Sequence, residues 1–264
     1  MASKRIISQD DGLIVRPSGP WIQKKYHFLS RYFAIFTKGM KNKWNPLTYI
    51  DLFAGPGRCL IEESGEEIDG SPLLALERDF SRYIFIEQNS ECLDALKQRS
   101  RRKQKFSQIE FIAGDCNVVI DQVQPAGLTV AFSDPTGLDL HFDTLRALTD
   151  GENVDLIANI QHGMDGKRNL KSYVRQQGQS KLDRFLGERA DRKKLSDWPD
   201  VWARYRERIE TLGYSIADAS NISVTNQQGV PMYFICFASK HPKGLEFWKK
   251  ISRIDEQGQR ELFH

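Results

Sequence analysis

Short apolar runs alternate with amphipathic segments along most of the chain. Five runs rich in β-branched and aromatic residues predict buried strands, and they cover residues 47–53, 82–87, 108–114, 128–134 and 154–160. The segments between them predict helices. One begins with Ser71 as N-cap and Pro72 in the first helical position, and others cover 90–103 and 142–150. Strands that alternate with helices indicate a parallel sheet with both faces covered.

The C-terminal part of the chain has a different pattern. A helical, basic insertion is predicted over about 166–213, followed by a sixth strand within 213–224. The sequence NQQG then turns the chain into a seventh strand over 231–239. Because a tight turn makes one of two consecutive strands antiparallel, we predict an α/β protein with a Rossmann-like methyltransferase fold. Its seven-stranded sheet is expected to be mostly parallel, with an antiparallel last strand.

Residues 1–264 are expected to form a single methyltransferase-like domain. An N-terminal helix is predicted over about 21–37, because apolar residues there recur at three- and four-residue spacing. A loop insertion is predicted over about 58–70. Within it, residues 59–61 and 67–69 can pair as a short hairpin about the sequence ESGE.

Composition limits the class of protein. The 264 residues are 40% hydrophobic, which is enough for a core, and no apolar run is long enough to span a membrane. The polar N-terminus has no apolar stretch typical of a signal peptide, so a cytoplasmic protein without a membrane partner is expected. Basic residues are concentrated at 97–105 and 166–208. Such clusters can neutralise the phosphates of RNA or DNA, and a solvated helix face is the alternative interpretation.

A glycine-containing loop, DLFAGPG, follows the first predicted strand. Asp51, Phe53, Ala54, Gly55 and Gly57 lie in it, at the sheet edge where α/β proteins bind ligands. The loop lacks the third glycine of the GxGxxG pattern of NAD enzymes, and it is closer to the acid-plus-glycine loop that holds S-adenosylmethionine. A tight turn with a capping acid is the alternative.

Two further acids follow the next two predicted strands. Glu87, followed by Gln88, could accept hydrogen bonds from ribose hydroxyls. Asp115, followed by Cys116, could accept one from an adenine amino group. Three acids after three successive strands beside a glycine loop predict a site for S-adenosylmethionine, with no metal ion.

The fourth predicted strand ends in FSDPTG. Asp134 and Pro135 resemble the start of the (D/N/S)PP(Y/F/W) signature of amino methyltransferases, although Thr136 and Gly137 replace the rest of it. Asp134 is therefore predicted to hold or deprotonate the methyl acceptor. His162, after the fifth strand, is expected to face the same cleft and orient the substrate. The chain has no Pro-Cys pair, which argues against the chemistry of cytosine-C5 methyltransferases.

Several stretches together resemble the three-Cys-motif partner (TcmP) family. They are GPWIQKKYHFLSRYF, YIDLFAGPG, IDGSPLLAL, YIFIEQN, GDCN, SDPTGL and FASKHPKGLEFWKKI. The resemblance implies a methyltransferase-like protein that binds S-adenosylmethionine, and a partner of the radical-SAM-like, three-Cys-motif type (phage Gp37/Gp68). The 58–70 insertion departs from the methyltransferase pattern, and its hairpin is expected to stand over the cofactor pocket, as a lid or a substrate-recognition surface.

Three functions follow as hypotheses. The first is an S-adenosylmethionine-dependent methyltransferase acting on RNA or DNA. The second is a non-catalytic partner or regulatory subunit of the radical-SAM-like protein, which the altered DPTG sequence favours. The third is a nucleic-acid enzyme that holds a divalent metal with Asp51, Glu87 and Asp134.

Overall fold

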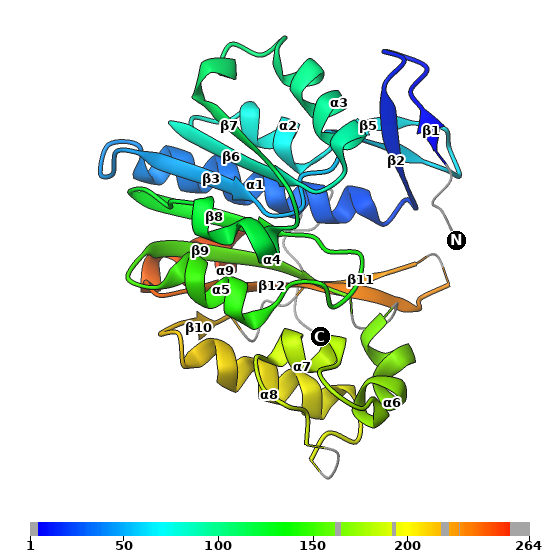
Figure 1. Cartoon of the computed structure of the whole chain (residues 1–264). Helices are drawn as coiled ribbons and strands as arrows, with labels where there is room; N and C mark the ends of the chain where they lie inside the picture. The colour runs from blue at the N-terminus through cyan, green and yellow to red at the C-terminus, as the bar shows by residue number, and fades with distance from the viewer. Residues whose placement is uncertain (1–4, 162–164, 192–193, 218–221, 227, 254–264) are drawn as a thin grey trace.

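The computed structural model describes residues 5–161, 165–191, 194–217, 222–226 and 228–253 of the chain (Figure 1). His162, predicted to orient the substrate, lies outside the described residues.

The main sheet has five neighbouring parallel strands, which extend inward from one of its edges (Figure 1). They are, in spatial order, β7 (Ile109–Ala113), β6 (Arg82–Glu87), β3 (Leu47–Asp51), β8 (Leu128–Ser133) and β9 (Asn153–Ile160). The five predicted parallel strands are confirmed, with ends shifted by at most two residues. Their carboxyl ends meet at one edge of the sheet, so that edge is where a ligand site is expected.

The edge of the sheet beyond β9 is antiparallel. β12 (Pro231–Ser239) pairs antiparallel with β9, and its other side pairs antiparallel with both β10 (Ser215–Ile216) and β11 (Ile222–Thr225). The sixth strand position is therefore filled by two short pieces, and the last strand is antiparallel as predicted. This order and these directions are those of the Rossmann-like methyltransferase fold.

Alternating side chains along the strands build two cores. Tyr49 and Tyr83 belong to the core on one face of the sheet, whereas Ile50 and Ile84 belong to the core on the other face. Because successive side chains of a strand point to opposite faces, continuous apolar runs are what a doubly covered sheet requires.

Nine α-helices lie in the described part of the chain. They are α1 (Ile22–Met40), α2 (Ser71–Leu76), α3 (Ser90–Ser100), α4 (Cys116–Val119), α5 (Phe142–Thr149), α6 (Lys167–Arg175), α7 (Lys181–Leu186), α8 (Trp198–Glu210) and α9 (Pro242–Ile251). Short 3-10 helices cover Phe106–Gln108 and Ile120–Gln122. The basic insertion is thus helical, as predicted. None of the helices described here has the length and apolar character needed to cross a bilayer.

The start of α2 differs from the prediction. Gly70 occupies the N-cap, and Ser71 is already helical. The Ser71 side chain instead hydrogen-bonds the Asp51 carboxyl group. A buried carboxyl group competes for the hydroxyl that would otherwise cap the helix.

A second, four-stranded sheet stands beside the main one (Figure 1). Its order is β1 (Ile6–Ile7), β2 (Ile14–Ser18), β4 (Arg58–Ile61), β5 (Glu67–Asp69). The β4–β5 hairpin is the one predicted in the loop insertion. The β1–β2 hairpin was not predicted, and β2 pairs parallel with β4.

Candidate functional site

A cavity of about 320 Å³ opens at the carboxyl ends of β3, β6, β7 and β8, and we call it the strand-end cavity. Residues of β2 complete its wall. Its lining is Ile14, Val15, Arg16, Pro17, Leu52, Phe53, Gly55, Pro56, Ile86, Glu87, Gln88, Asn89, Cys92, Gly114, Asp115, Cys116, Asp134 and Thr136. The structure thus brings together seven predicted site residues from four different strand ends.

The glycine loop fixes the carboxylate of Glu87. The backbone N–H of Gly55 donates to Oε2 at 2.8 Å, and that of Asn89 donates to Oε1 at 2.7 Å. Gly55 has a φ of 64°, and the space that a β-carbon would occupy there is open. Since each carboxylate oxygen can accept more than one hydrogen bond, Glu87 keeps two oriented acceptors for a neighbouring pair of hydroxyls.

Asp115 and Cys116 form the far side of the cavity. Asp115 caps α4, because its Oδ1 accepts from the backbone N–H of Asn117 at 2.9 Å. Burial, assisted by the charge of Asp115, raises the pKa of the Cys116 thiol to about 12. Cys116 is therefore a neutral wall residue. Asp115 Oδ2 accepts no hydrogen bond from the residues described, so it is open to a ligand.

Four predicted site residues lie outside the cavity lining. Ala54 and Gly57 are buried within the loop, and Pro135 is buried behind Asp134 and Thr136. Asp51 is fully buried, where its carboxyl group accepts from the Tyr49 hydroxyl at 2.8 Å. Burial raises the pKa of Asp51 to about 6, although hydrogen bonds from Ser71 and Tyr49 oppose the rise.

Asp134 is held by a lysine that the sequence interpretation did not select. Lys25 of α1 lies 2.5 Å from Oδ2, and the side-chain amide of Asn159 donates to Oδ1 at 2.5 Å. Burial alone would raise the pKa of Asp134, but attraction by Lys25 and Arg16, together with these hydrogen bonds, lowers it. Asp134 is thus an ionised, oriented carboxylate and a weak base.

A sequence signal for Lys25 existed in the N-terminal helix. Lys25 lies three residues after Ile22 and four before Leu29, within the apolar stripe of α1, and it is only 4% exposed. The ring centroids of Tyr26 and Tyr233 lie 5.0 and 5.5 Å from its Nζ. A charged residue on a buried helix face indicates a buried partner, which here is Asp134.

Arg16 and Thr136 also belong to the site. Arg16 of β2 donates from Nη2 to the Thr136 hydroxyl at 3.3 Å, so it links the N-terminal hairpin to the loop after β8. Arg16 was missed because the hairpin that carries it was not predicted.

Arg99 fastens the N-terminal hairpin to the glycine loop. Its guanidinium donates twice to Asp11, at 2.8 and 2.9 Å, and also to the carbonyls of Ile14 and Pro56 at 2.9 and 2.6 Å. Mainly through the hydrogen bond from Arg99, the pKa of Asp11 falls to about 2. Arg99 therefore supports both walls of the cavity from behind.

The two basic clusters differ in how far they are neutralised. At 97–105, Arg99 is buried, and Lys97, Lys103 and Lys105 each form an ion pair. On α6, Lys167, Arg168 and Lys171 are exposed, and among the residues described they form no ion pair. Arg101 and Arg102 are exposed and form no ion pair with the residues described, so the first cluster is only partly neutralised.

The third hypothesis required three carboxylates to gather round a metal ion. Asp51, Glu87 and Asp134 are each hydrogen-bonded to different neighbours. Across the described ranges, no group of three or more histidine, cysteine, aspartate or glutamate side chains could hold a metal ion.

No family model and no curated relative matches the chain. Among solved structures, a conserved hypothetical protein of Streptococcus pyogenes is 18% identical with a TM-score of 0.35, and the match covers 43% of this chain and 66% of that one. TYW2 of M. jannaschii, solved with AdoMet, is 9% identical with a TM-score of 0.49, over 89% and 84% of the two chains. The O-methyltransferase TomG of Streptomyces achromogenes, solved with SAM, is 11% identical with a TM-score of 0.45, over 83% and 79%.

These similarities are too low to indicate what this chain binds or does. The strand order and directions of the chain itself define its fold, and the strand-end cavity is its candidate site.

Proposed function

We propose that the protein is an S-adenosylmethionine-dependent methyltransferase. The observation that carries the proposal is the fixed carboxylate of Glu87, oriented by the backbone of Gly55 at the mouth of an open cavity. A ribose needs two acceptors for its neighbouring hydroxyls, and Glu87 offers two. The cavity also lies where this fold class binds ligands.

The other wall residues fit the rest of the cofactor. The free oxygen of Asp115 suits the amino group of adenine, and Leu52, Phe53 and Ile86 give an apolar surface for the base. Gly55, with open space at its α-carbon, lets the methionine portion approach the backbone closely. Asp51 supports the loop from the protein interior rather than contacting the cofactor.

Asp134 is proposed to position the methyl acceptor. The cofactor would supply an activated methyl group for direct transfer, so alignment of the acceptor is the main task of the protein. Lys25 and Asn159 occupy one acceptor position on each oxygen of Asp134 and leave others for a substrate N–H or O–H. Because its pKa is lowered, Asp134 orients the acceptor and leaves proton removal to solvent.

Calorimetry with S-adenosylhomocysteine tests the proposal. Glu87→Ala should weaken binding by about tenfold or more, since two charge-assisted hydrogen bonds are lost. Glu110→Ala is the matched control, because Glu110 is a paired glutamate of the neighbouring strand that lies outside the cavity. No binding to the wild-type protein, or equal affinity in the two variants, would contradict the proposal.

RNA or DNA is the substrate class we propose. Support comes from Lys167, Arg168 and Lys171, which lie on the first helix after β9 and therefore near the carboxyl edge of the sheet (Figure 1). Replacing all three with glutamate should make the binding of single-stranded RNA or DNA less dependent on salt. The slope of the logarithm of the association constant against the logarithm of the salt concentration should be smaller by about two. Fluorescence anisotropy across a salt series measures this slope, and an unchanged slope would count against the assignment.

A non-catalytic partner protein is the second candidate. One observation that favours it is that Asp134 already accepts a hydrogen bond from Lys25. Another is that Thr136 and Gly137 leave the DPTG loop without an aromatic side chain on which a base could stack. The three-Cys-motif radical-SAM-like protein is the proposed partner in that case. Cofactor binding without methyl transfer to any nucleic acid, together with co-purification of that partner, would favour this second function.

A further inference from the structure

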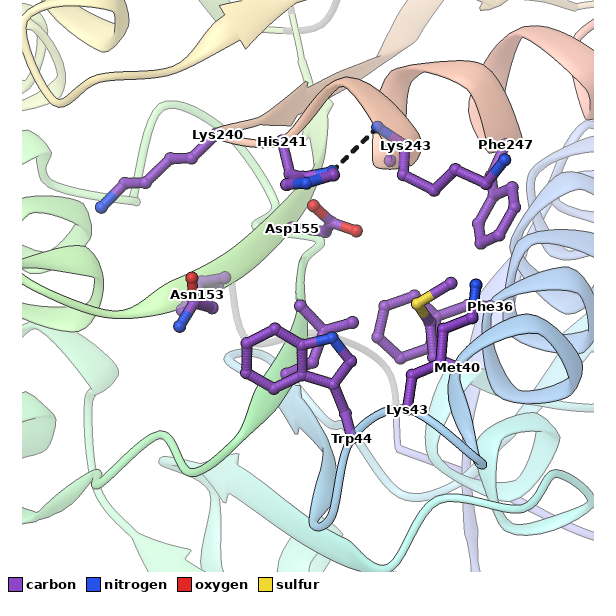
Figure 2. A pocket seen from close by; sticks show the side chains of 13 residues that line it. Phe36, Met40, Lys43, Trp44, Asn153, Asp155, Lys240, His241, Lys243 and Phe247 are labelled. Atoms are coloured by element: carbon purple, nitrogen blue, oxygen red, sulfur yellow. Dashed lines mark hydrogen bonds between the residues drawn. The ribbon is translucent and has the colours of Figure 1, made fainter.

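A second cavity, of about 470 Å³, lies at the opposite edge of the sheet from the strand-end cavity. Figure 2 shows its lining from close by. It opens beside Leu128 and Asn153, the first residues of β8 and β9, between the end of α1 and the start of α9. We call it the basal cavity. Since parallel strands carry the proposed cofactor site at their carboxyl ends, the basal cavity is a separate site.

The walls of the basal cavity are largely apolar. Phe36, Met40 and Phe247 are buried core residues on one side, and Trp44 stands across from them (Figure 2). Trp44 is 40% exposed, and within the described part of the chain its ring stacks on no other aromatic ring. An exposed tryptophan beside an apolar hollow is a surface on which a flat ring can be buried.

The rim of the basal cavity is cationic. Lys43 is exposed and makes no ion pair or side-chain hydrogen bond with the residues described. Lys240 points away from the hollow (Figure 2), donates to a backbone carbonyl of Glu152 and interacts with nearby acidic side chains, while Lys243 is paired with Glu246 at 2.6 Å. Lys43 therefore brings to this opening an ammonium group that has no carboxylate partner among the described residues.

His241 adds a second donor to the same rim. Its Nδ1 accepts from the backbone N–H of Lys243 at 3.1 Å, which caps α9 (Figure 2). In the neutral ring the hydrogen is then on Nε2, and none of the described residues accepts it. A ligand oxygen could take this hydrogen bond.

The one carboxyl group in the lining does not offset these cations at the opening. Asp155 is only 6% exposed, and its Oδ2 accepts from the Tyr32 hydroxyl at 2.6 Å. Burial raises its pKa, against hydrogen bonds from Ser239 and Tyr32. Asp155 is thus committed to the protein interior and is not free to pair with a cationic ligand.

We propose that the basal cavity binds a small aromatic anion, with its ring against Trp44 and its carboxylate, sulfonate or phosphate at Lys43 and His241. The volume lies within the range of small-molecule sites. The apolar walls favour a ligand with an aromatic ring. The donors without partners at the rim favour a ligand that carries a hydrogen-bond acceptor at one end. The site is independent of the proposed methyltransferase activity.

Fluorescence titration with 8-anilinonaphthalene-1-sulfonate tests this proposal on the full chain. N-phenyl-1-naphthylamine, which has the same rings and no sulfonate, is the matched neutral probe. Trp44→Ala should weaken binding of both probes, by about tenfold. Lys43→Glu should weaken only the sulfonate, by about fivefold. Lys38→Glu, at an exposed residue near the end of α1 and outside the cavity lining, is the charge-matched control.

A saturating amount of S-adenosylhomocysteine separates the two sites. If the sulfonate binds in the basal cavity, S-adenosylhomocysteine should not displace it, whether or not S-adenosylhomocysteine itself binds to the protein. Asn153→Trp, which places a large ring at an exposed mouth residue, should abolish binding without disturbing the core. Displacement by S-adenosylhomocysteine, or equal effects of Lys43→Glu and Lys38→Glu, would overturn the proposal.

Discussion

The ion pair between Asp11 and Arg99 gives the most direct stability prediction. Both side chains are nearly buried, at 7% and 5% exposure, and Arg99 also holds the carbonyls of Ile14 and Pro56. Asp11→Asn removes the negative charge and keeps the shape of the side chain. The buried guanidinium then loses its only ionic partner among the described residues while keeping its two carbonyl acceptors.

The magnitude follows from the pKa of Asp11. A carboxyl group whose pKa falls from 3.8 to about 2 on folding stabilises the folded state by about 2.5 kcal/mol at neutral pH. Removing one partner of a buried pair typically costs about 3 to 5 kcal/mol. Because the two carbonyls still satisfy part of Arg99, we expect Asp11→Asn to lower the free energy of unfolding by about 3 kcal/mol.

Urea unfolding at several pH values is the assay. The stability that Asp11 contributes is present above its unfolded pKa of 3.8 and is lost as the pH falls towards about 2. The difference between wild type and Asp11→Asn should therefore shrink over that interval. Asp10→Asn is the control, since Asp10 is 65% exposed and its pair with Arg58 should contribute about 1 kcal/mol or less. Equal effects of the two variants, or a difference that does not vary with pH, would refute the reasoning.

Two other substitutions test the interior of the site. Because burial raises the pKa of Asp51 from 3.8 to about 6, the folded state keeps a proton that the unfolded state loses in this interval. As the pH rises from 4 to 6, the free energy of unfolding of the wild type should therefore fall by roughly 3 kcal/mol relative to that of Asp51→Asn. Stabilities of the two proteins that change in parallel with pH would contradict this. Lys25→Met removes the ionic partner of the buried Asp134 and should lower the free energy of unfolding by about 4 kcal/mol. Adding Asp134→Asn to this variant should restore part of the lost stability. If urea unfolding shows that the effects of the two substitutions simply add, the two residues are not coupled.

The main sheet could be predicted from sequence because each strand carries its own signal. The runs at 82–87 and 231–239 coincide with β6 and β12, since continuous apolar segments bounded by polar ones are typical of strands buried on both faces. The split sixth strand could not be foreseen, because its two pieces are defined by pairing along different parts of β12.

The N-terminal hairpin shows what local pattern leaves out. Its strand β2 pairs with β4, more than forty residues later in the chain, and is anchored by Arg99 of α3. Nothing within residues 1–20 indicates either contact. The same limit hid the role of Arg99, which in the sequence is one of six basic residues at 97–105 and cannot be told from its solvated neighbours.

The candidate site was predictable as a set of strand ends rather than as a set of contacts. The position of Glu87 and Asp115 after consecutive strands was enough to expect them in one cavity. The inward turn of Asp51 could not be deduced, because it depends on the hydroxyl groups of Tyr49 and Ser71 meeting it in the core.

A crystal structure with S-adenosylhomocysteine would test the central claim most directly. The account predicts a nucleoside in the strand-end cavity, with its ribose hydroxyls within hydrogen-bonding distance of Glu87 and its base beside Asp115. A nucleoside bound elsewhere, or a strand-end cavity left empty at a concentration that saturates the protein in solution, would contradict it.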